Sequence, residues 1–196
     1  MAEVMEKLIK NAIDKLPSVR GSFLTLLNNV NGQKEIIGAE IGVYQGLNAV
    51  NMLRNCSRLK LYCVDGYERI TVETGGAIVS KREIDTIRDF SIALLNLFKD
   101  RVIRIFQQSE ICYKDFPDEY FDYVYIDGEH LYDWVKRDIE LWYPKVKKGG
   151  ILAGHDYEMS SVMRAVTEFR DIRNMKNFTF STGNGESDWW FIKQNT

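Results

Sequence analysis

The sequence is poor in features that would mark a disulfide-linked, zinc-binding or membrane protein. Its three cysteines, Cys56, Cys63 and Cys112, show no C-x-x-C spacing, which argues against a disulfide framework and a structural zinc site. No stretch approaches the ~20 apolar residues of a membrane span. The N-terminal MAEVMEKLIK lacks the basic segment and apolar run of a signal peptide. We therefore expect reduced thiols, no membrane segment and a cytoplasmic location.

An excess of charge of one sign is also lacking. Lys and Arg number 26 against 28 Asp and Glu, giving a net charge of -2, and there is no long basic block. An electrostatic nucleic-acid binder is therefore not expected. Apolar residues make up 45% and charged residues 28%, close to globular averages, which excludes collagen-like and wholly disordered chains. A length of 196 residues predicts a single domain over 1–196.

Helix-like and strand-like segments alternate along most of the chain. Apolar residues from Met5 to Leu16 recur at helical spacing until Pro17, and a second helix is expected over 22–30, so 1–34 is interpreted as a helical cap. The core, 35–196, has apolar strand-like runs alternating with helices, which predicts a mostly parallel sheet covered on both faces. Strands are expected at 36–42, 59–66, 101–108, 121–128 and 149–156, and helices at 47–54, from 80, 131–143 and 159–169.

The end of the chain breaks this alternation. Two strand-like runs, 177–182 and 188–194, flank a Gly-rich turn with no helix between them, which predicts an antiparallel hairpin. We therefore expect a doubly wound, seven-stranded α/β fold. The loop over 67–79 and the N-terminal helices are interpreted as a lid over the site.

Polar residues follow the predicted strands at the positions where an open α/β sheet binds ligands, at the carboxyl ends. Both histidines of the chain, His130 and His155, fall there. The first turn reads Glu40-x-Gly42-x-x-x-Gly46, which is neither G-x-G-x-x-G nor a Walker A motif. A carboxylate before the first glycine would repel a pyrophosphate and suits a cationic ligand, although Glu40 alone also fits a strand-end cap. Asp65, roughly 20 residues further on, suits ribose hydroxyls.

With these residues, GAEIGVYQGLNA resembles the first motif of class I S-adenosylmethionine-dependent methyltransferases, in the branch around the catechol O-methyltransferases. The resemblance covers roughly 35–193, including the terminal hairpin, and implies S-adenosylmethionine as cofactor. It implies that the methionine end is held after the first strand, the ribose after the second and the adenine after the third. The implied cofactor contacts are Glu40, Gly42, Tyr44, Gly46, Asn48, Asp65, Gly66, Gln108, Ser109 and Asp127.

The segment 121–157 is similar to the region of metal-assisted O-methyltransferases that binds a divalent cation. The resemblance implies Asp127, His155 and Asp156 as metal ligands, where the catechol enzymes use Asp, Asp and Asn. Magnesium or manganese is the expected ion. The histidine weakens the case for magnesium and favours manganese, iron or zinc. The other interpretation is that no metal binds and Asp127 orients the cofactor or a histidine.

His130 stands where the catechol enzymes carry their general-base lysine, and a histidine is able to accept a hydroxyl proton near pH 7. The alternative is a helix-capping histidine. Asp138 is interpreted as a solvated helix acid outside the site.

The sequence therefore predicts a methyltransferase acting on a small-molecule hydroxyl, with His130 and Asp127 as catalytic residues. The alternatives are an N-methyltransferase on the same fold, a metal-binding oxygenase-like relative and a non-catalytic binding module. A homodimer is left open, and the sequence does not identify the methyl acceptor.

Overall fold

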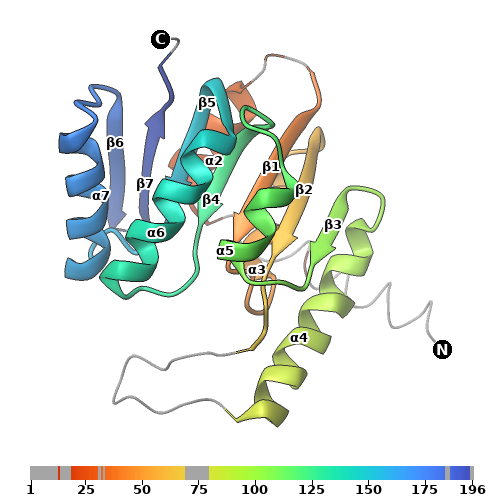
Figure 1. The fold of residues 1–196 in the computed structure, drawn as a ribbon. Coiled ribbons are helices and arrows are strands. Elements are labelled where there is room, and N and C mark those ends of the chain that lie inside the picture. The colour runs from red at the N-terminus through yellow and green to blue at the C-terminus, as the bar shows by residue number, and fades with distance from the viewer. Residues whose placement is uncertain are drawn as a thin grey trace.

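The computed structural model describes residues 13, 19–30, 32, 34–68, 80–183 and 186–194 (Figure 1). The helix predicted from Met5 to Leu16, apart from Ile13, lies outside the described residues. So does most of the loop predicted over 67–79, from residue 69 onward.

Seven strands form one sheet in the order β3-β2-β1-β4-β5-β7-β6. The first five pair in parallel, and β7 runs antiparallel to both β5 and β6, which confirms the predicted fold with its terminal hairpin. The strands are β1 Ile36–Ile41, β2 Leu59–Val64, β3 Val102–Ile105, β4 Phe121–Ile126, β5 Val146–Gly154, β6 Phe178–Gly183 and β7 Glu186–Ile192.

The central strands are buried on both faces because helices cover both sides of the sheet. All six residues of β4, FDYVYI, are buried, as a parallel strand between two helical layers requires. One core cluster lies under α2, α3 and α4, and the other lies under α5, α6 and α7. The helices are α2 Gly21–Asn29, α3 Leu47–Asn55, α4 Lys81–Leu95, α5 Ser109–Cys112, α6 Tyr132–Trp142 and α7 Ser160–Ile172.

Local sequence signals explain several of these boundaries. Ser80 and Glu83 form a reciprocal capping box at the start of α4, in which the Glu83 amide donates to Ser80 Oγ at 3.3 Å and the Ser80 amide donates to the Glu83 carboxylate at 2.9 Å.

Trp189 and Trp190 alternate across β7, so each is buried in a different core cluster. The hairpin thus extends both hydrophobic layers.

Two differences from the sequence-based expectation concern a short helix and the start of a strand. The single turn α5 is separated from β3 by three residues, and its four residues are too few for a helical period to be recognised. β5 starts at Val146, three residues earlier than predicted, because Gly149 and Gly150 lie within the strand. Within the described residues, no helix is long and apolar enough to cross a membrane.

The second helix of the predicted cap is present as α2. Its buried face, Phe23, Leu24 and Leu27, belongs to the core cluster that also contains Tyr123 and Tyr125 of β4. The Phe23 and Tyr125 ring centroids lie 4.8 Å apart. This packing brings Arg20, the residue before α2, to the carboxyl edge of the sheet.

Candidate functional site

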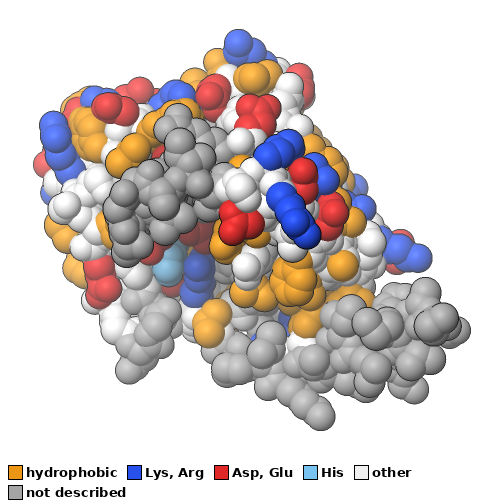
Figure 2. Space-filling view, turned by 90° about the horizontal axis from the view of Figure 1, so that it is seen from below, with side chains coloured by type: hydrophobic (Ala, Val, Ile, Leu, Met, Phe, Trp, Pro, Cys, Tyr) orange, Lys and Arg blue, Asp and Glu red, His pale blue; other side chains and the backbone are white. Residues whose placement is uncertain are grey.

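The side chains predicted to carry chemistry gather at the carboxyl edge of the parallel strands. Figure 2 views the molecule from below relative to Figure 1, toward the ends at which the β1 and β2 arrows point, and shows histidine beside acidic and basic side chains. The site has two halves. The first half follows β1, β2 and β3, and the second half follows β4 and β5.

The turn after β1 depends on glycine at two places. Gly42 has φ +86°, and a Cβ there would lie 2.4 Å from the backbone oxygen of Asp127. The neighbouring Asp127 amide donates to the Ile41 carbonyl at 2.7 Å, so the turns after β1 and β4 touch through their backbones. Gly46, with φ +79°, starts α3 in a left-handed conformation. Gly42 therefore allows the close approach of the two halves, and Gly46 allows the sharp start of α3.

Asp65 holds the turns of the first half in place by accepting backbone hydrogen bonds. One of its carboxylate oxygens, Oδ2, accepts the Val43 amide at 2.9 Å and the Tyr44 amide at 2.8 Å. The other, Oδ1, accepts the Tyr67 amide at 2.8 Å. A carboxylate has about four lone-pair sites, so three backbone donors leave capacity for one ligand hydroxyl. The residue predicted to bind ribose thus also fixes the turn after β1.

Glu40, at the end of β1, is almost completely buried, with 1% of its surface exposed. Its Oε1 accepts Asn48 Nδ2 at 2.8 Å. Burial first, and the nearby charge of Asp127 second, raise the pKa of Glu40 to about 8. Among the described residues, neither Glu40 Oε2 nor Asn48 Oδ1 has a hydrogen-bond partner. Two buried acceptors without a donor fit a cationic donor such as an ammonium group.

The third strand end brings Gln108 and Ser109 to the same edge. A Cβ on Gly66 would lie 2.9 Å from Gln108 Nε2, so the ends of β2 and β3 are in close contact. Gln108 Nε2 donates to Glu68 at 3.1 Å. Ser109 Oγ donates to Asp138 of α6 at 2.6 Å.

The interpretation of Asp138 as a solvated acid is wrong. It is 4% exposed, and burial raises its pKa to about 6. The helical period places Asp138 one position before Ile139, on the buried face of α6, and this was the available signal.

In the second half, one carboxylate serves both histidines. His130 Nε2 lies 2.7 Å from Asp156 Oδ2, and His155 Nδ1 lies 3.1 Å from Asp156 Oδ1. Burial opposes ionisation of Asp156, but the hydrogen bonds from His130 and His155 outweigh it and hold its pKa well below the usual range. Asp156 itself has φ +57°, an uncommon conformation that aspartate tolerates better than most residues.

Asp127, His130 and Asp156 form a group that could hold a metal ion, since one ligand atom from each lies within 4.8 Å of the others. The sequence-based set was Asp127, His155 and Asp156. His155 Nδ1 lies 3.9 Å from Asp127 Oδ1, so the structure brings both histidines to the two carboxylates. Carboxylate oxygens with imidazole nitrogen suit manganese, iron or zinc better than magnesium.

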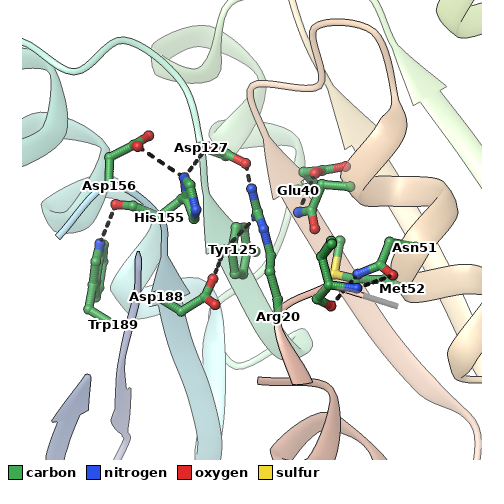
Figure 3. Close-up of polar contacts among 12 residues, drawn as sticks. Arg20, Glu40, Asn51, Met52, Tyr125, Asp127, His155, Asp156, Asp188 and Trp189 are labelled. Carbon is green, nitrogen blue, oxygen red and sulfur yellow. Dashed lines mark hydrogen bonds and ion pairs between the residues drawn. The ribbon is translucent and has the colours of Figure 1, made fainter. Parts of the chain in front are cut away.

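Arg20 contacts the candidate site, although nothing in the sequence indicated this contact. Its Nη1 donates to Tyr125 Oη at 2.6 Å and to Asp127 Oδ2 at 3.1 Å (Figure 3). Tyr125 in turn donates to Asp188 of β7, which is completely buried. Burial disfavours the charged guanidinium, but Tyr125, Asp127 and Asp188 hold the pKa of Arg20 above its ordinary value. A chain of contacts therefore links β7, β4 and α2 to Asp127.

Only one signal pointed to this chain of contacts. An aspartate inside the apolar strand DWWFI is costly to bury unless it is partnered, so Asp188 marked a buried polar contact. Arg20 carried no comparable signal, because its position depends on how α2 packs.

Comparison with known proteins gives one family and a set of similar folds. Residues 39–157 match the family model described as a methyltransferase domain. An uncharacterized protein of Sinorhizobium fredii is 33% identical over 79 residues, a match that covers 38% of this chain and only 9% of that protein.

Solved structures share the fold at low sequence identity. A Bacillus cereus O-methyltransferase in complex with SAH is 14% identical, with a TM-score of 0.61, covering 96% of this chain and 90% of that chain. A SAM-dependent O-methyltransferase from Thermotoga maritima is 12% identical, with a TM-score of 0.63, covering 96% and 72%. A Corynebacterium glutamicum protein is 14% identical, with a TM-score of 0.62, covering 100% and 90%.

Proposed function

The chain belongs to the methyltransferase-domain family, and from that premise we propose that it transfers a methyl group from S-adenosylmethionine to a hydroxyl group of a small molecule. The observation that carries the choice of an oxygen acceptor is the pair of His130 Nε2 and Asp156 Oδ2, 2.7 Å apart, beside Asp127. A hydroxyl needs a base to accept its proton during methylation, and a histidine oriented by a carboxylate is suited to that role.

The first half of the site fits the cofactor. Glu40 Oε2 and Asn48 Oδ1 are buried acceptors that an ammonium group would satisfy. Asp65 retains capacity for a ribose hydroxyl, and Gln108 and Ser109 lie beyond it on the adenine side. When bound, S-adenosylmethionine would supply a methyl group on a sulfonium centre. The acceptor oxygen would attack the methyl carbon, forming a carbon–oxygen bond as the carbon–sulfur bond breaks, and S-adenosylhomocysteine would leave.

The second half would align the acceptor and take its proton. The close approach of Asp156 Oδ2 to His130 Nε2, 2.7 Å, favours the imidazolium that His130 becomes when it accepts the hydroxyl proton. The hydroxyl proton passes to His130, and Asp156 stabilises the imidazolium that forms. Because the chemistry is a direct displacement, the remaining task of the residues is to orient the acceptor and exclude water.

A divalent metal fits the same half in one of two ways. If Asp127, His155 and Asp156 hold the ion, His130 stays available as the base and the ion lowers the pKa of the acceptor hydroxyl. If His130 is itself a ligand, its nitrogen facing Asp156 is occupied, and the ion alone would activate the hydroxyl. Removal of His130 would weaken metal binding only in the second case, in which His130 is a ligand.

The test is a methyl-transfer assay with paired acceptors that differ only in carrying a hydroxyl or an amine at the same position. The protein is used after chelation with EDTA, and again after addition of manganese or magnesium. We expect methylation of the hydroxyl member and stimulation by manganese. Methylation of the amine member alone would favour the N-methyltransferase alternative, and full activity in chelator would reduce Asp127 and Asp156 to orienting groups.

A further inference from the structure

We propose that Arg20 is a specificity-determining residue that binds the carboxylate of the amino-acid end of the cofactor. This inference rests on the proposed function, since it concerns how the same site recognises S-adenosylmethionine. It starts from the several acidic side chains around the position where the methionine end of the cofactor would bind. Glu40 and Asp127 lie on either side of the Arg20 guanidinium in Figure 3, and Asp188 lies below it.

An amino-acid end is zwitterionic, so its two groups need opposite partners. The ammonium is suited to Glu40 Oε2 and Asn48 Oδ1, the buried acceptors without a donor among the described residues. Asp127, Asp188 and Glu40 are all acids, and Glu40 becomes an anion once an ammonium binds it, so the ligand carboxylate requires a cation among them. Arg20 supplies that cation, and it acts on these acids electrostatically.

The geometry of Arg20 leaves donors for such a ligand. Within the part of the chain that the structure describes, its hydrogen bonds to Tyr125 and Asp127 use Nη1 alone. A guanidinium has five N–H donors, so Nε and Nη2 are available to an incoming carboxylate. The side chain is 13% exposed, which means that it is held from the protein side and still reaches the surface of the site.

The backbone around Arg20 adds to the positive potential. Arg20 precedes the nine-residue helix α2 in a left-handed conformation, with φ 60° and ψ 46°, and no side chain caps the helix start. The first amides of a helix carry partial positive charge, which favours an anion near Arg20. Tyr125 and Asp188 prevent the guanidinium from turning away, because Asp188 accepts from the same Tyr125 hydroxyl that holds Nη1.

The experiment measures whether Arg20 distinguishes ligands by their carboxylate. Isothermal titration calorimetry of the full chain in EDTA compares S-adenosylhomocysteine with its analogue that keeps the amine and lacks the carboxylate. The wild-type protein should prefer S-adenosylhomocysteine by about 10- to 100-fold, the size of a charge-assisted hydrogen bond. Arg20→Gln should weaken S-adenosylhomocysteine by about that factor and the analogue by less than about 3-fold, and Arg20→Lys should retain part of the preference. Arg170→Gln, a surface change beside Asp171, is the matched control and should alter neither affinity.

The outcomes separate the inference about Arg20 from the proposed function. Equal weakening of both ligands by Arg20→Gln would mean that Arg20 only supports the fold, and this would overturn the inference. So would a wild-type protein that binds the two ligands equally, a result that needs no variant to fold. A wild-type protein that binds neither ligand would contradict the proposed function itself.

Discussion

The two halves of the carboxyl edge are held together in different ways. In the first half, which we propose binds the cofactor (the cofactor half), backbone groups make most of the contacts, since Asp65 accepts three backbone amides and Gly42 allows direct backbone contact with Asp127. In the second half, which we propose binds the methyl acceptor (the acceptor half), polar and charged side chains contact one another, with Asp156 between His130 and His155. Loss of one charged partner leaves the others misoriented, whereas a backbone-braced turn keeps more of its shape. We therefore expect substitutions in the acceptor half to lower turnover and those in the cofactor half to lower affinity and stability.

The largest effect is expected from His130→Ala. Removing the proposed base should lower kcat by ~10²–10⁴, the usual contribution of a general base. The affinity for S-adenosylhomocysteine should change little, because the cofactor half is intact. Steady-state kinetics and calorimetry on the same protein measure both quantities.

The matched variant is His155→Ala. If His155 is a metal ligand, this substitution should lower turnover, and added manganese should partly restore it. Near-normal kcat in His130→Ala, with a metal-independent loss in His155→Ala, would place the base after β5 rather than after β4.

Asp156→Asn should have the next largest effect. Asparagine tolerates the left-handed backbone at φ +57°, so the substitution removes charge while keeping the turn. Both histidines lose their anionic partner, and turnover should fall by about 10- to 100-fold. Asp171→Asn, on the exposed end of α7, is the control and should leave kcat unchanged. Turnover equal to that of the control would show that Asp156 does not orient the histidines.

Asp65→Ala tests the contribution of the cofactor half. The loss of hydrogen bonds to a charged group should weaken cofactor binding by ~1–3 kcal/mol. Three backbone amides also lose their acceptor, so the melting temperature without ligand should fall. Asp65→Asn keeps one acceptor oxygen and should show smaller losses of both kinds. Calorimetry and thermal unfolding measure the two effects, and unchanged affinity in Asp65→Ala would mean that the ribose lies elsewhere.

The smallest effect on the reaction is expected from Asp138, whose contribution is to pH-dependent stability. Its pKa is raised from 3.8 to about 6 in the fold, so the folded state holds the proton more tightly than the unfolded state. The contribution of Asp138 to the free energy of unfolding is therefore fully present below about pH 4 and is lost as the pH rises through 6. The free energy of unfolding should change by at most about 1.4 kcal/mol per pH unit over this range. Urea unfolding of wild type and Asp138→Asn from pH 4 to 7 measures it. The stability difference between them should change over this window in favour of the variant, and a constant difference would contradict the assignment.

The parts of the fold that follow from local pattern were predictable from the sequence. The apolar run of β4, the capping box at Ser80 and the hairpin around the Gly-rich turn each depend on residues near one another in the chain. The gathering of Asp127, His130 and Asp156 was also predictable, because parallel strands end at one edge. This rule places residues at the edge but does not determine which histidine nitrogen faces which carboxylate.

The remaining site residues depend on packing between distant segments. Arg20 reaches Asp127 across 107 positions of sequence, and Tyr125 reaches Asp188 across 63. No period or motif encodes such a contact, since it exists only after α2 and the hairpin have packed on the sheet. Asp138 lies between these cases, because its helical face was predictable and its bond to Ser109 was not.

The measurement that tests the central claim most directly is the thermal unfolding of the chain with S-adenosylhomocysteine and, separately, with NAD. A ligand that binds only the folded state at about 100 times its Kd stabilises it by about 2.7 kcal/mol. For a chain of this length, that corresponds to a rise of roughly 5–10 °C in Tm. S-adenosylhomocysteine should produce this rise, and NAD at the same concentration should not, because Glu40, at the end of β1, lies where a pyrophosphate would bind. A rise in Tm with NAD and none with S-adenosylhomocysteine would contradict the account.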